Sequence, residues 1–280
     1  MNPSNLQLLV HLDPASASSR RLAYARRLAE RLDAALAALY AATPGYLELP
    51  YAPELGPSLA AELVALDAER RARTVKMFDQ VAATAGPTAT WSEAKDMAVV
   101  PAMTQQALHA DLLVLGQYER DSDAIGGVPF DFVETVLAAS GRPAVVVPYV
   151  GWPGAVADVV AIAWKPTREA ARALSASLPL LRGAREVHVL TWGPSAESGI
   201  FGAQLDLAGY LRLHGVQARW HNGGPEPHAL GEVLLSRTAD LGADVLVMGC
   251  YGHARAREWV LGGTSRTILE AMTLPVLMAH

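Results

Sequence analysis

The chain has 280 residues, a formal net charge of −5 and 51% hydrophobic residues. This composition supplies enough apolar side chains for a sizeable core and excludes an intrinsically disordered chain, and the length predicts about two domains. The negative charge and the scattered basic residues argue against a nucleic-acid-binding surface. With a single cysteine, Cys250, no internal disulfide can form.

The N-terminal segment, MNPSNLQLLVHLD, lacks the basic region and the long apolar region of a signal peptide. No apolar run reaches the roughly 20 residues that are needed to span a bilayer. We therefore expect a soluble cytoplasmic protein that does not interact with membranes.

Apolar periodicity predicts alternating strands and helices in the first half of the chain. Strands are expected at 6–12, 35–40, 88–91, 112–115 and 144–147. Helices are expected up to about residue 31 and at 59–85, 97–109 and 130–139. The segment 43–57 contains four prolines and is predicted to be a loop.

A Gly-Trp-Pro-Gly segment at 151–154 marks the domain boundary, and the pattern then repeats. Strands are expected at 159–163, 187–190, 216–220, 245–248 and 276–278. Helices are expected at 168–181, at 201–213, within 227–241 and after residue 265.

The repeat is also visible in the residues themselves. Ala-Asp-Leu-Leu-Val-Leu-Gly at 110–116 matches Ala-Asp-Val-Leu-Val-Met-Gly at 243–249. Strands that alternate with helices form parallel sheets with helices on both faces, and right-handed crossovers favour a doubly wound order. The sequence therefore predicts an α/β protein with two tandem Rossmann-like domains, 1–150 and 155–280, each a five-stranded parallel sheet.

A glycine-rich loop follows the predicted strand at 245–248. Its residues are spaced as Gly-x2-Gly-x9-Gly and lead into a helix: Met248, Gly249, Gly252, Gly262, Gly263, Thr264 and Ser265. Glycines allow close approach of the backbone, and a helix N-terminus offers free N–H groups and partial positive charge, so such a loop can hold phosphate. The spacing is neither that of a P-loop nor that of the G-x-G-x-x-G dinucleotide fingerprint, and ordinary turn chemistry is the alternative explanation.

The spacing resembles that of the universal stress protein family, whose nucleotide-binding members carry Gly-x2-Gly-x9-Gly-Ser/Thr at this place. The match holds at Gly249, Gly252 and Gly262 but departs at Gly263, where the family has a hydroxyl residue. The internal repeat extends the resemblance to the whole chain as a tandem member. The resemblance implies the adenine-nucleotide α-hydrolase-like version of the Rossmann fold, and it implies ATP or another adenine nucleotide as the ligand.

The two halves keep different parts of the site that the resemblance implies. The first half keeps Asp13, the residue type that contacts the nucleoside in the family, but has Glu119 in place of the second glycine. The second half keeps the glycines but has Lys165 at the position of Asp13. Lysine cannot accept a hydrogen bond from a ribose hydroxyl, although it can pair with a phosphate; a solvated lysine is the alternative. We expect nucleotide only in the second half.

Other reactive residue types show no site pattern. Three basic residues lie in the nine-residue spacer between Gly252 and Gly262: His253, Arg255 and Arg257. They either contact a phosphate or are ordinary solvated side chains. Cys250 is expected to be a small packed residue rather than a reactive thiol. The eight histidines form no metal-binding motif, so no metal is expected.

Three functions remain open at this point. The first is a stress-response regulatory protein that binds an adenine nucleotide in its second domain. The others are a weak ATP hydrolase that uses the same loop and a nucleotide-free scaffold that acts through protein partners; no general base is evident, so an enzyme is not expected. In the family, the last strands of two domains pair, which here implies an intramolecular pseudo-dimer and leaves a homodimer open.

Overall fold

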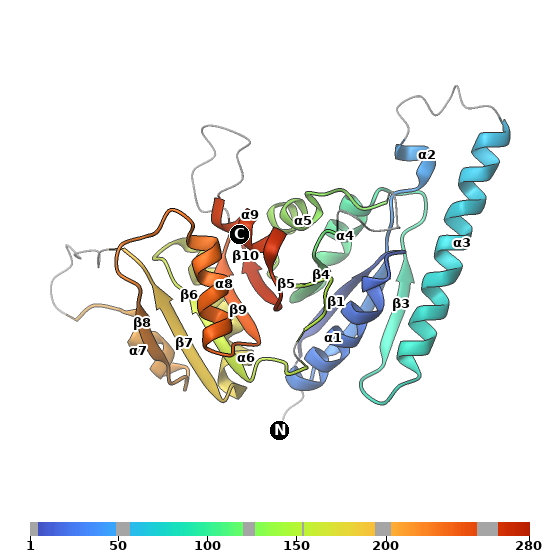
Figure 1. Ribbon diagram of the computed structural model, residues 1–280. Coiled ribbons are helices and arrows are strands. Elements are labelled where there is room, and N and C mark those ends of the chain that lie inside the picture. Colours follow the sequence, from blue (N-terminus) through green and yellow to red (C-terminus); the bar gives the residue numbers. More distant parts are fainter. Residues whose placement is uncertain (1–4, 49–56, 120–126, 153, 194–202, 251–262) are drawn as a thin grey trace. The chain divides into compact units, whose positions relative to one another are not determined.

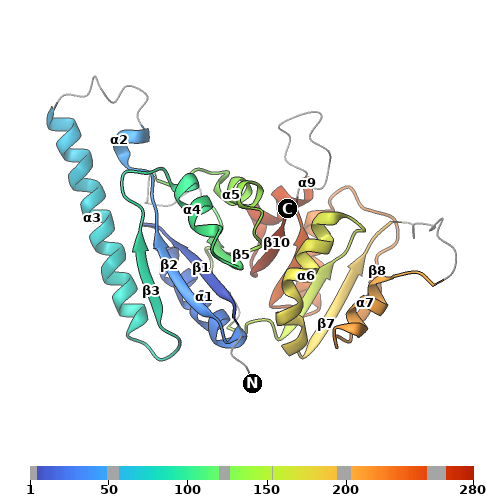
Figure 2. The same ribbon diagram turned by 180° about the vertical axis from the view of Figure 1, so that it is seen from behind.

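A computed structural model describes residues 5–48, 57–119, 127–152, 154–193, 203–250 and 263–280. The chain divides into two compact units, Met1–Gly151 and Trp152–His280. Each unit is an α/β domain built on a parallel sheet (Figures 1 and 2). This confirms the fold class that the alternating pattern predicted.

The first unit alternates strands with helices along the chain. Its strands are β1 (Gln7–Leu12), β2 (Ala35–Tyr40), β3 (Ala89–Glu93), β4 (Leu112–Gly116) and β5 (Ala144–Val147). Its helices are α1 (Ala17–Leu32), α2 (Gly45–Glu48), α3 (Pro57–Ala82), α4 (Val99–Ala107) and α5 (Phe132–Ser140). The strands are parallel in the order β3-β2-β1-β4-β5. Because parallel crossovers are right-handed, α1 and α3, which touch each other, cover one face, and α4 and α5 cover the other.

The second unit repeats this arrangement. Its strands are β6 (Val159–Ala163), β7 (Glu186–Thr191), β8 (Arg219–Asn222), β9 (Val245–Gly249) and β10 (Val276–Ala279). Its helices are α6 (Arg168–Gly183), α7 (Leu207–Leu213), α8 (Leu230–Asp240) and α9 (Gly263–Ala271). The strands are parallel in the order β10-β9-β6-β7-β8. None of the helices within the described ranges is both long enough and apolar enough to cross a membrane.

The register makes the two units comparable residue by residue. Leu8 in β1 pairs with Leu112 in β4, and Val160 in β6 pairs with Val245 in β9. The aspartate before each of these partner strands has the same role. Asp111 Oδ2 accepts the Gln7 N–H at 2.8 Å, and Asp244 Oδ2 accepts the Val159 N–H at 3.2 Å. The matching Ala-Asp segments in the sequence therefore act as equivalent caps at the starts of β1 and β6.

Three predicted elements differ from the structure. The proline-rich segment predicted as a loop contains the short helix α2. Helix α7 begins at Leu207, whereas it was predicted from residue 201, which lies outside the described residues. The strand predicted at 216–220 is β8, shifted toward the C-terminus.

The shift of β8 has a local cause at the end of α7. Gly215 has a positive φ of 76°, and the Val216 N–H donates to the Leu211 carbonyl at 2.9 Å. This is the hydrogen bond of a Schellman cap, in which a glycine reverses the chain and the next apolar residue packs back on the helix. Val216 is 4% exposed and belongs to this cap rather than to the strand.

Candidate functional site

The carboxyl ends of β6 and β9 lie side by side in the second unit, since Ala163 pairs with Met248. Lys165 follows β6 by two residues, and its side chain is 54% exposed. Its Nζ lies 3.1 Å from Glu226 Oε2, whose side chain is also largely in solvent. Lys165 is therefore an accessible cation at the sheet edge where ligands bind in open α/β folds, held by a surface ion pair.

Gly249, at the end of β9, has a structural requirement for glycine. A Cβ built there would lie 2.4 Å from the Ala170 backbone nitrogen and 2.6 Å from the Glu169 carbonyl carbon. The first turn of α6 therefore rests directly on Gly249. The same turn has its own cap, because the Thr167 hydroxyl accepts the Ala170 N–H at 3.2 Å. Close packing against α6 therefore accounts for Gly249, which is the last residue of β9 and does not have a positive φ.

The other predicted site residues are only partly described. Met248 is buried at 5% exposure. Gly263, Thr264 and Ser265 form the first turn of α9. That turn contains no acidic residue, and the Ser265 side chain is buried. Five of them lie outside the described residues: Gly252, Gly262, His253, Arg255 and Arg257. The structure therefore brings Lys165 and Gly249 to one edge of the sheet.

Cys250 is a packed residue. It is 1% exposed, its N–H donates to the Ala279 carbonyl at 3.0 Å, and its thiol donates to the same carbonyl at 3.3 Å. A thiol buried in this way is not an accessible nucleophile, in agreement with the expectation from the sequence.

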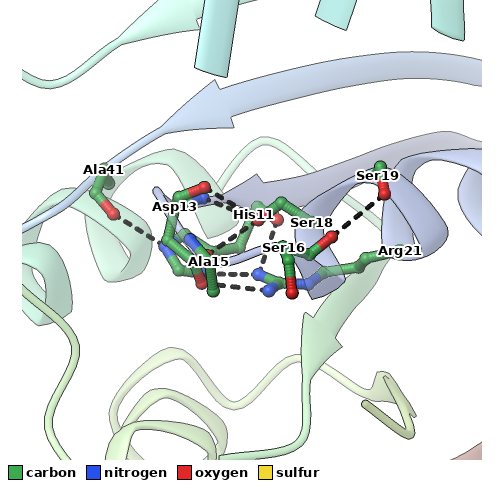
Figure 3. A network of polar contacts seen from close by, with 8 residues as sticks. All are labelled: His11, Asp13, Ala15, Ser16, Ser18, Ser19, Arg21 and Ala41. Carbon is green, nitrogen blue, oxygen red and sulfur yellow. Dashed lines mark hydrogen bonds and ion pairs between the residues drawn. The ribbon is translucent and has the colours of Figure 1, made fainter. Parts of the chain in front are cut away.

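The first unit holds a buried charged network at the equivalent edge (Figure 3). Asp13 follows β1, is 7% exposed, and accepts hydrogen bonds from the Ser18 hydroxyl at 2.8 Å and the Ala15 N–H at 2.9 Å. Arg21, on the first turns of α1, donates from Nη2 to Asp13 Oδ2 at 2.9 Å. Both carboxylate oxygens of Asp13 are therefore used within the protein.

His11 completes this network from within β1. Its Nε2 lies 2.8 Å from the Ala41 carbonyl oxygen, and its Nδ1 lies 2.9 Å from Arg21 Nη1. The carbonyl can only accept and the guanidinium can only donate, so Nε2 carries the proton and Nδ1 accepts from Arg21. The hydrogen bonds thus require the neutral imidazole.

The pKa values follow from this arrangement. Burial is the main cause that lowers the pKa of His11 from 6.5 to about 4; Asp13 opposes this effect and the charge of Arg21 adds to it. Burial by itself would raise the pKa of Asp13, but the charge of Arg21 and the hydrogen bond from Ser18 outweigh it and hold that pKa at about 2. At neutral pH the network therefore contains one carboxylate, one guanidinium and one neutral imidazole.

Arg21 also covers the end of β4. A Cβ on Gly116 would lie 2.6 Å from Arg21 Cζ, so the guanidinium lies flat against this glycine. A cavity of about 60 Å³ remains beside it, with Tyr118 and Phe130 at its exposed rim. Typical ligand pockets measure about 300–1,000 Å³, so this cavity is far too small for a nucleotide.

Asp13 was a candidate residue from the sequence, whereas its partners His11 and Arg21 were not. Two signals could have found them. His11 is a polar residue inside the apolar strand QLLVHL, and Arg21 lies on the buried stripe of α1 between Ala17 and Ala25. A charged residue on a buried helical face needs a partner of opposite charge, and Asp13 is the nearest acidic residue in the sequence.

Two histidines lie side by side in the second unit. His221 lies in β8, and its Nε2 is 3.0 Å from Nδ1 of the buried His188. Burial lowers the pKa of His188, and the neighbouring His221 adds to that effect. Within the described ranges, no group of three histidine, cysteine, aspartate or glutamate residues has the geometry to hold a metal ion.

Comparison with solved structures places this architecture among known folds. A universal stress protein from Archaeoglobus fulgidus DSM 4304 superposes with a TM-score of 0.66 at 17% identity, covering 98% of this chain and 95% of the other. A candidate universal stress protein from Pseudomonas aeruginosa UCBPP-PA14 gives a TM-score of 0.60 at 14% identity, covering 99% and 94%. A functionally unknown protein from Pseudomonas aeruginosa PAO1 gives 0.59 at 14%, covering 99% and 93%.

No family model matches the chain, and no curated protein matches it. Identities of this size relate folds and do not transfer ligands or activities. The superpositions on the first two structures nevertheless cover nearly the full length of this chain and of each compared chain. The chain therefore has the fold of the universal stress proteins, with both α/β units present in one polypeptide.

Proposed function

We propose that this protein is a stress-response regulatory protein of the tandem universal stress protein type, and that it binds an adenine nucleotide in its second unit only. The observation that carries the proposal is a difference between the two units in the side chains at the carboxyl ends of their strands. In the first unit Arg21 lies on Gly116 and engages both His11 and Asp13. In the second unit the position of Arg21 is taken by Ala173, which has no group to place over the strand ends.

The residues present fit a phosphate better than they fit a ribose. Lys165 offers a compact positive charge and no acceptor, and the backbone N–H groups of Gly249, Gly252 and Gly262 would surround a phosphate oxygen if the loop follows the family pattern. Thr264, which is partly exposed, would supply a hydroxyl group from α9 in place of the residue at Gly263, whereas Ser265 is buried. Both members of the Lys165–Glu226 pair are half exposed, and such pairs contribute about 0–1 kcal/mol, so a phosphate can displace Glu226 at little cost.

Isothermal titration calorimetry with ATP, ADP and adenosine tests the proposal on the full chain. Glu226→Gln should tighten ATP binding, because it removes the anion that competes for Lys165. Gly252→Asp should weaken binding at least tenfold, because two like charges about 4 Å apart repel by about 1 kcal/mol in water and by several at a partly buried site. Lys76→Met, a change of an exposed lysine on α3, is the charge-matched control and should have no effect.

Lys165→Asp distinguishes the two roles of this position. If Lys165 serves a phosphate, the change weakens binding and lessens its dependence on salt. If Lys165 occupies the nucleoside position, the new carboxylate supplies a ribose acceptor and binding tightens. Phosphate release measured in the same samples tests the weak ATP hydrolase. Absence of ATP binding in both the wild type and Lys165→Asp would refute nucleotide binding and leave the scaffold as the function.

A further inference from the structure

Trp91 and Trp220 occupy the same position in the two units. Trp91 of β3 pairs with Ala38 of β2, which pairs with Val10 of β1. Trp220 of β8 pairs with Val189 of β7, which pairs with Ile162 of β6. Val10 and Ile162 each lie two residues after the equivalent positions Leu8 and Val160. The two tryptophans are therefore equivalent residues on the edge strands of the two sheets.

The first unit covers its tryptophan with a helix. The 26-residue helix α3 brings Phe78 to Trp91, with ring centroids 5.0 Å apart in an edge-to-face arrangement. Tyr40 stacks against the same indole at 5.9 Å. Phe78 is 8% exposed as a result. Aromatic pairs of this geometry contribute about 0.5–1.5 kcal/mol beyond the area that they bury.

The second unit leaves its tryptophan half uncovered. The corresponding helix, α7, has only seven residues (Figures 1 and 2), and Trp220 is 49% exposed. A groove of about 360 Å³ lies between α7 and β8, with Ala208, Leu211, Val216, Ala218 and Trp220 as its apolar lining. Leu213, on the same helix, is 83% exposed. An exposed apolar surface with a groove is typical of a site of protein interaction.

The groove also carries a charge of one sign. Among the described residues, Arg212 is the only ionisable side chain that lines it. Arg219, next to Trp220 in β8, points to the opposite face of the sheet because successive residues of a strand alternate; there it pairs with Glu186 at 2.8 Å. An occupant would therefore combine an apolar face with an acidic side chain near Arg212.

We propose that this surface, the Trp220 groove, binds an amphipathic helix of a partner protein. The partner helix inserts an aromatic side chain against Trp220, as Phe78 does against Trp91, and places an acidic residue beside Arg212. Helix α3 has this pattern, since Asp79 follows Phe78. The first unit thus provides both the template for the interaction and a probe for it. The proposal does not depend on nucleotide binding.

The probe is a fluorescently labelled peptide of residues 57–82, and the measurement is its fluorescence anisotropy in the presence of the full-length protein. We expect saturable binding that weakens at least tenfold in Trp220→Ala, because buried tryptophans dominate such interfaces. Phe78→Ala in the peptide should cause a similar loss, and the two changes together should lose less than the product of the two, as expected for residues in direct contact. Circular dichroism establishes that each variant is folded.

Two further variants test whether the peptide binds in the Trp220 groove and not at another exposed aromatic side chain. Ala208→Glu places a bulky anion in the groove without altering Trp220, and it should also weaken binding at least tenfold. Phe130→Ala removes an aromatic side chain that is 69% exposed in the first unit, and it should leave binding unchanged. Failure of the peptide to bind, or equal binding to wild type and Trp220→Ala, would overturn the proposal.

The proposal would also be overturned if the groove were occupied by a second copy of the chain or by the chain's own residues. Sedimentation velocity that shows a dimer of the wild type and a monomer of Trp220→Ala would assign the groove to a second copy of the chain. Iodide quenching compared between wild type and Trp220→Phe isolates the emission of Trp220. An indole shielded from iodide in the free monomer would mean that the chain's own residues cover the groove.

Discussion

The ends of β1 and β4 in the first unit and the ends of β6 and β9 in the second share one backbone arrangement but differ in their side chains. In the first unit His11, Asp13 and Arg21 are buried and bonded to one another. The aligned residues in the second unit are Ala163, Lys165 and Ala173, of which only Lys165 is charged. One repeat has converted a sheet edge into a closed ionic network, while the other keeps a solvent-exposed cation there.

This difference shows how a site can close without a change of fold. A guanidinium against Gly116 occupies the space over the strand end and gives Asp13 an internal partner, so no ligand is needed to satisfy that carboxylate. Among the described residues, the ion pair of Lys165 is an exposed one with Glu226. Exposed pairs exchange partners readily, whereas a buried pair holds its geometry because breaking it leaves an uncompensated charge.

The largest expected effect comes from breaking the closed network. Arg21→Met leaves Asp13 buried without a counter-charge, and removal of one partner of a buried pair costs about 3–5 kcal/mol. The free energy of unfolding, measured by urea titration with hydrogen exchange followed separately in peptides of each unit, should fall by that amount in the first unit. Lys165→Met is the control in the second unit and should change stability by at most about 0.5 kcal/mol. Equal effects of the two changes would contradict the comparison.

The pH dependence of stability should be the next largest effect. The folded pKa of His11 is about 4 and the unfolded value is 6.5, so the unfolded chain binds a proton first as the pH falls. His11 therefore costs the first unit stability between about pH 6.5 and 4, by about 3 kcal/mol at the lower limit. Asp13 acts lower, since its pKa of about 2 makes its contribution disappear as the pH falls from 3.8 toward 2.

Urea titrations of the wild type and His11→Phe across this range measure the contribution of His11. The variant should lose the part of the pH dependence between about pH 6.5 and 4, although the loss of two hydrogen bonds lowers its stability at neutral pH. A first unit whose unfolding free energy is constant between pH 6.5 and 4 would show that His11 is not held neutral.

The smallest effects should come from the two equivalent glycines. Gly249→Ala forces a Cβ against the backbone of α6, at 2.4 Å from the Ala170 nitrogen. Gly116→Ala forces it against the Arg21 guanidinium, at 2.6 Å from Cζ. Each should cost about 1–3 kcal/mol, as overpacking usually does, measured by urea titration. Only Gly116→Ala should alter the pH dependence of unfolding, because it alone displaces a partner of His11; an equal change in Gly249→Ala would argue against this.

The sequence by itself determined most of the strands and the repeat. The strands predicted at 35–40, 144–147 and 159–163 have the same bounds in the structure. Buried strands of parallel sheets are short continuous apolar runs, which are readable without tertiary information. Asp111 and Asp244 were matched in the sequence because they occupy the same position in the repeated segments 110–116 and 243–249. The structure adds that both accept backbone N–H groups at the starts of β1 and β6.

Only the tertiary structure decided which side chains meet at the sheet edges. The sequence identified Asp13 as the part of the family site that a nucleotide-free first half keeps. That it faces Arg21 depends on the packing of α1 against β1 and β4. Likewise, the equivalence of Trp91 and Trp220 follows from strand register, which pairs Trp91 with Ala38 and Trp220 with Val189. Local pattern specifies which residues are buried, but partners that are distant in sequence are chosen by register and by the direction in which each element packs.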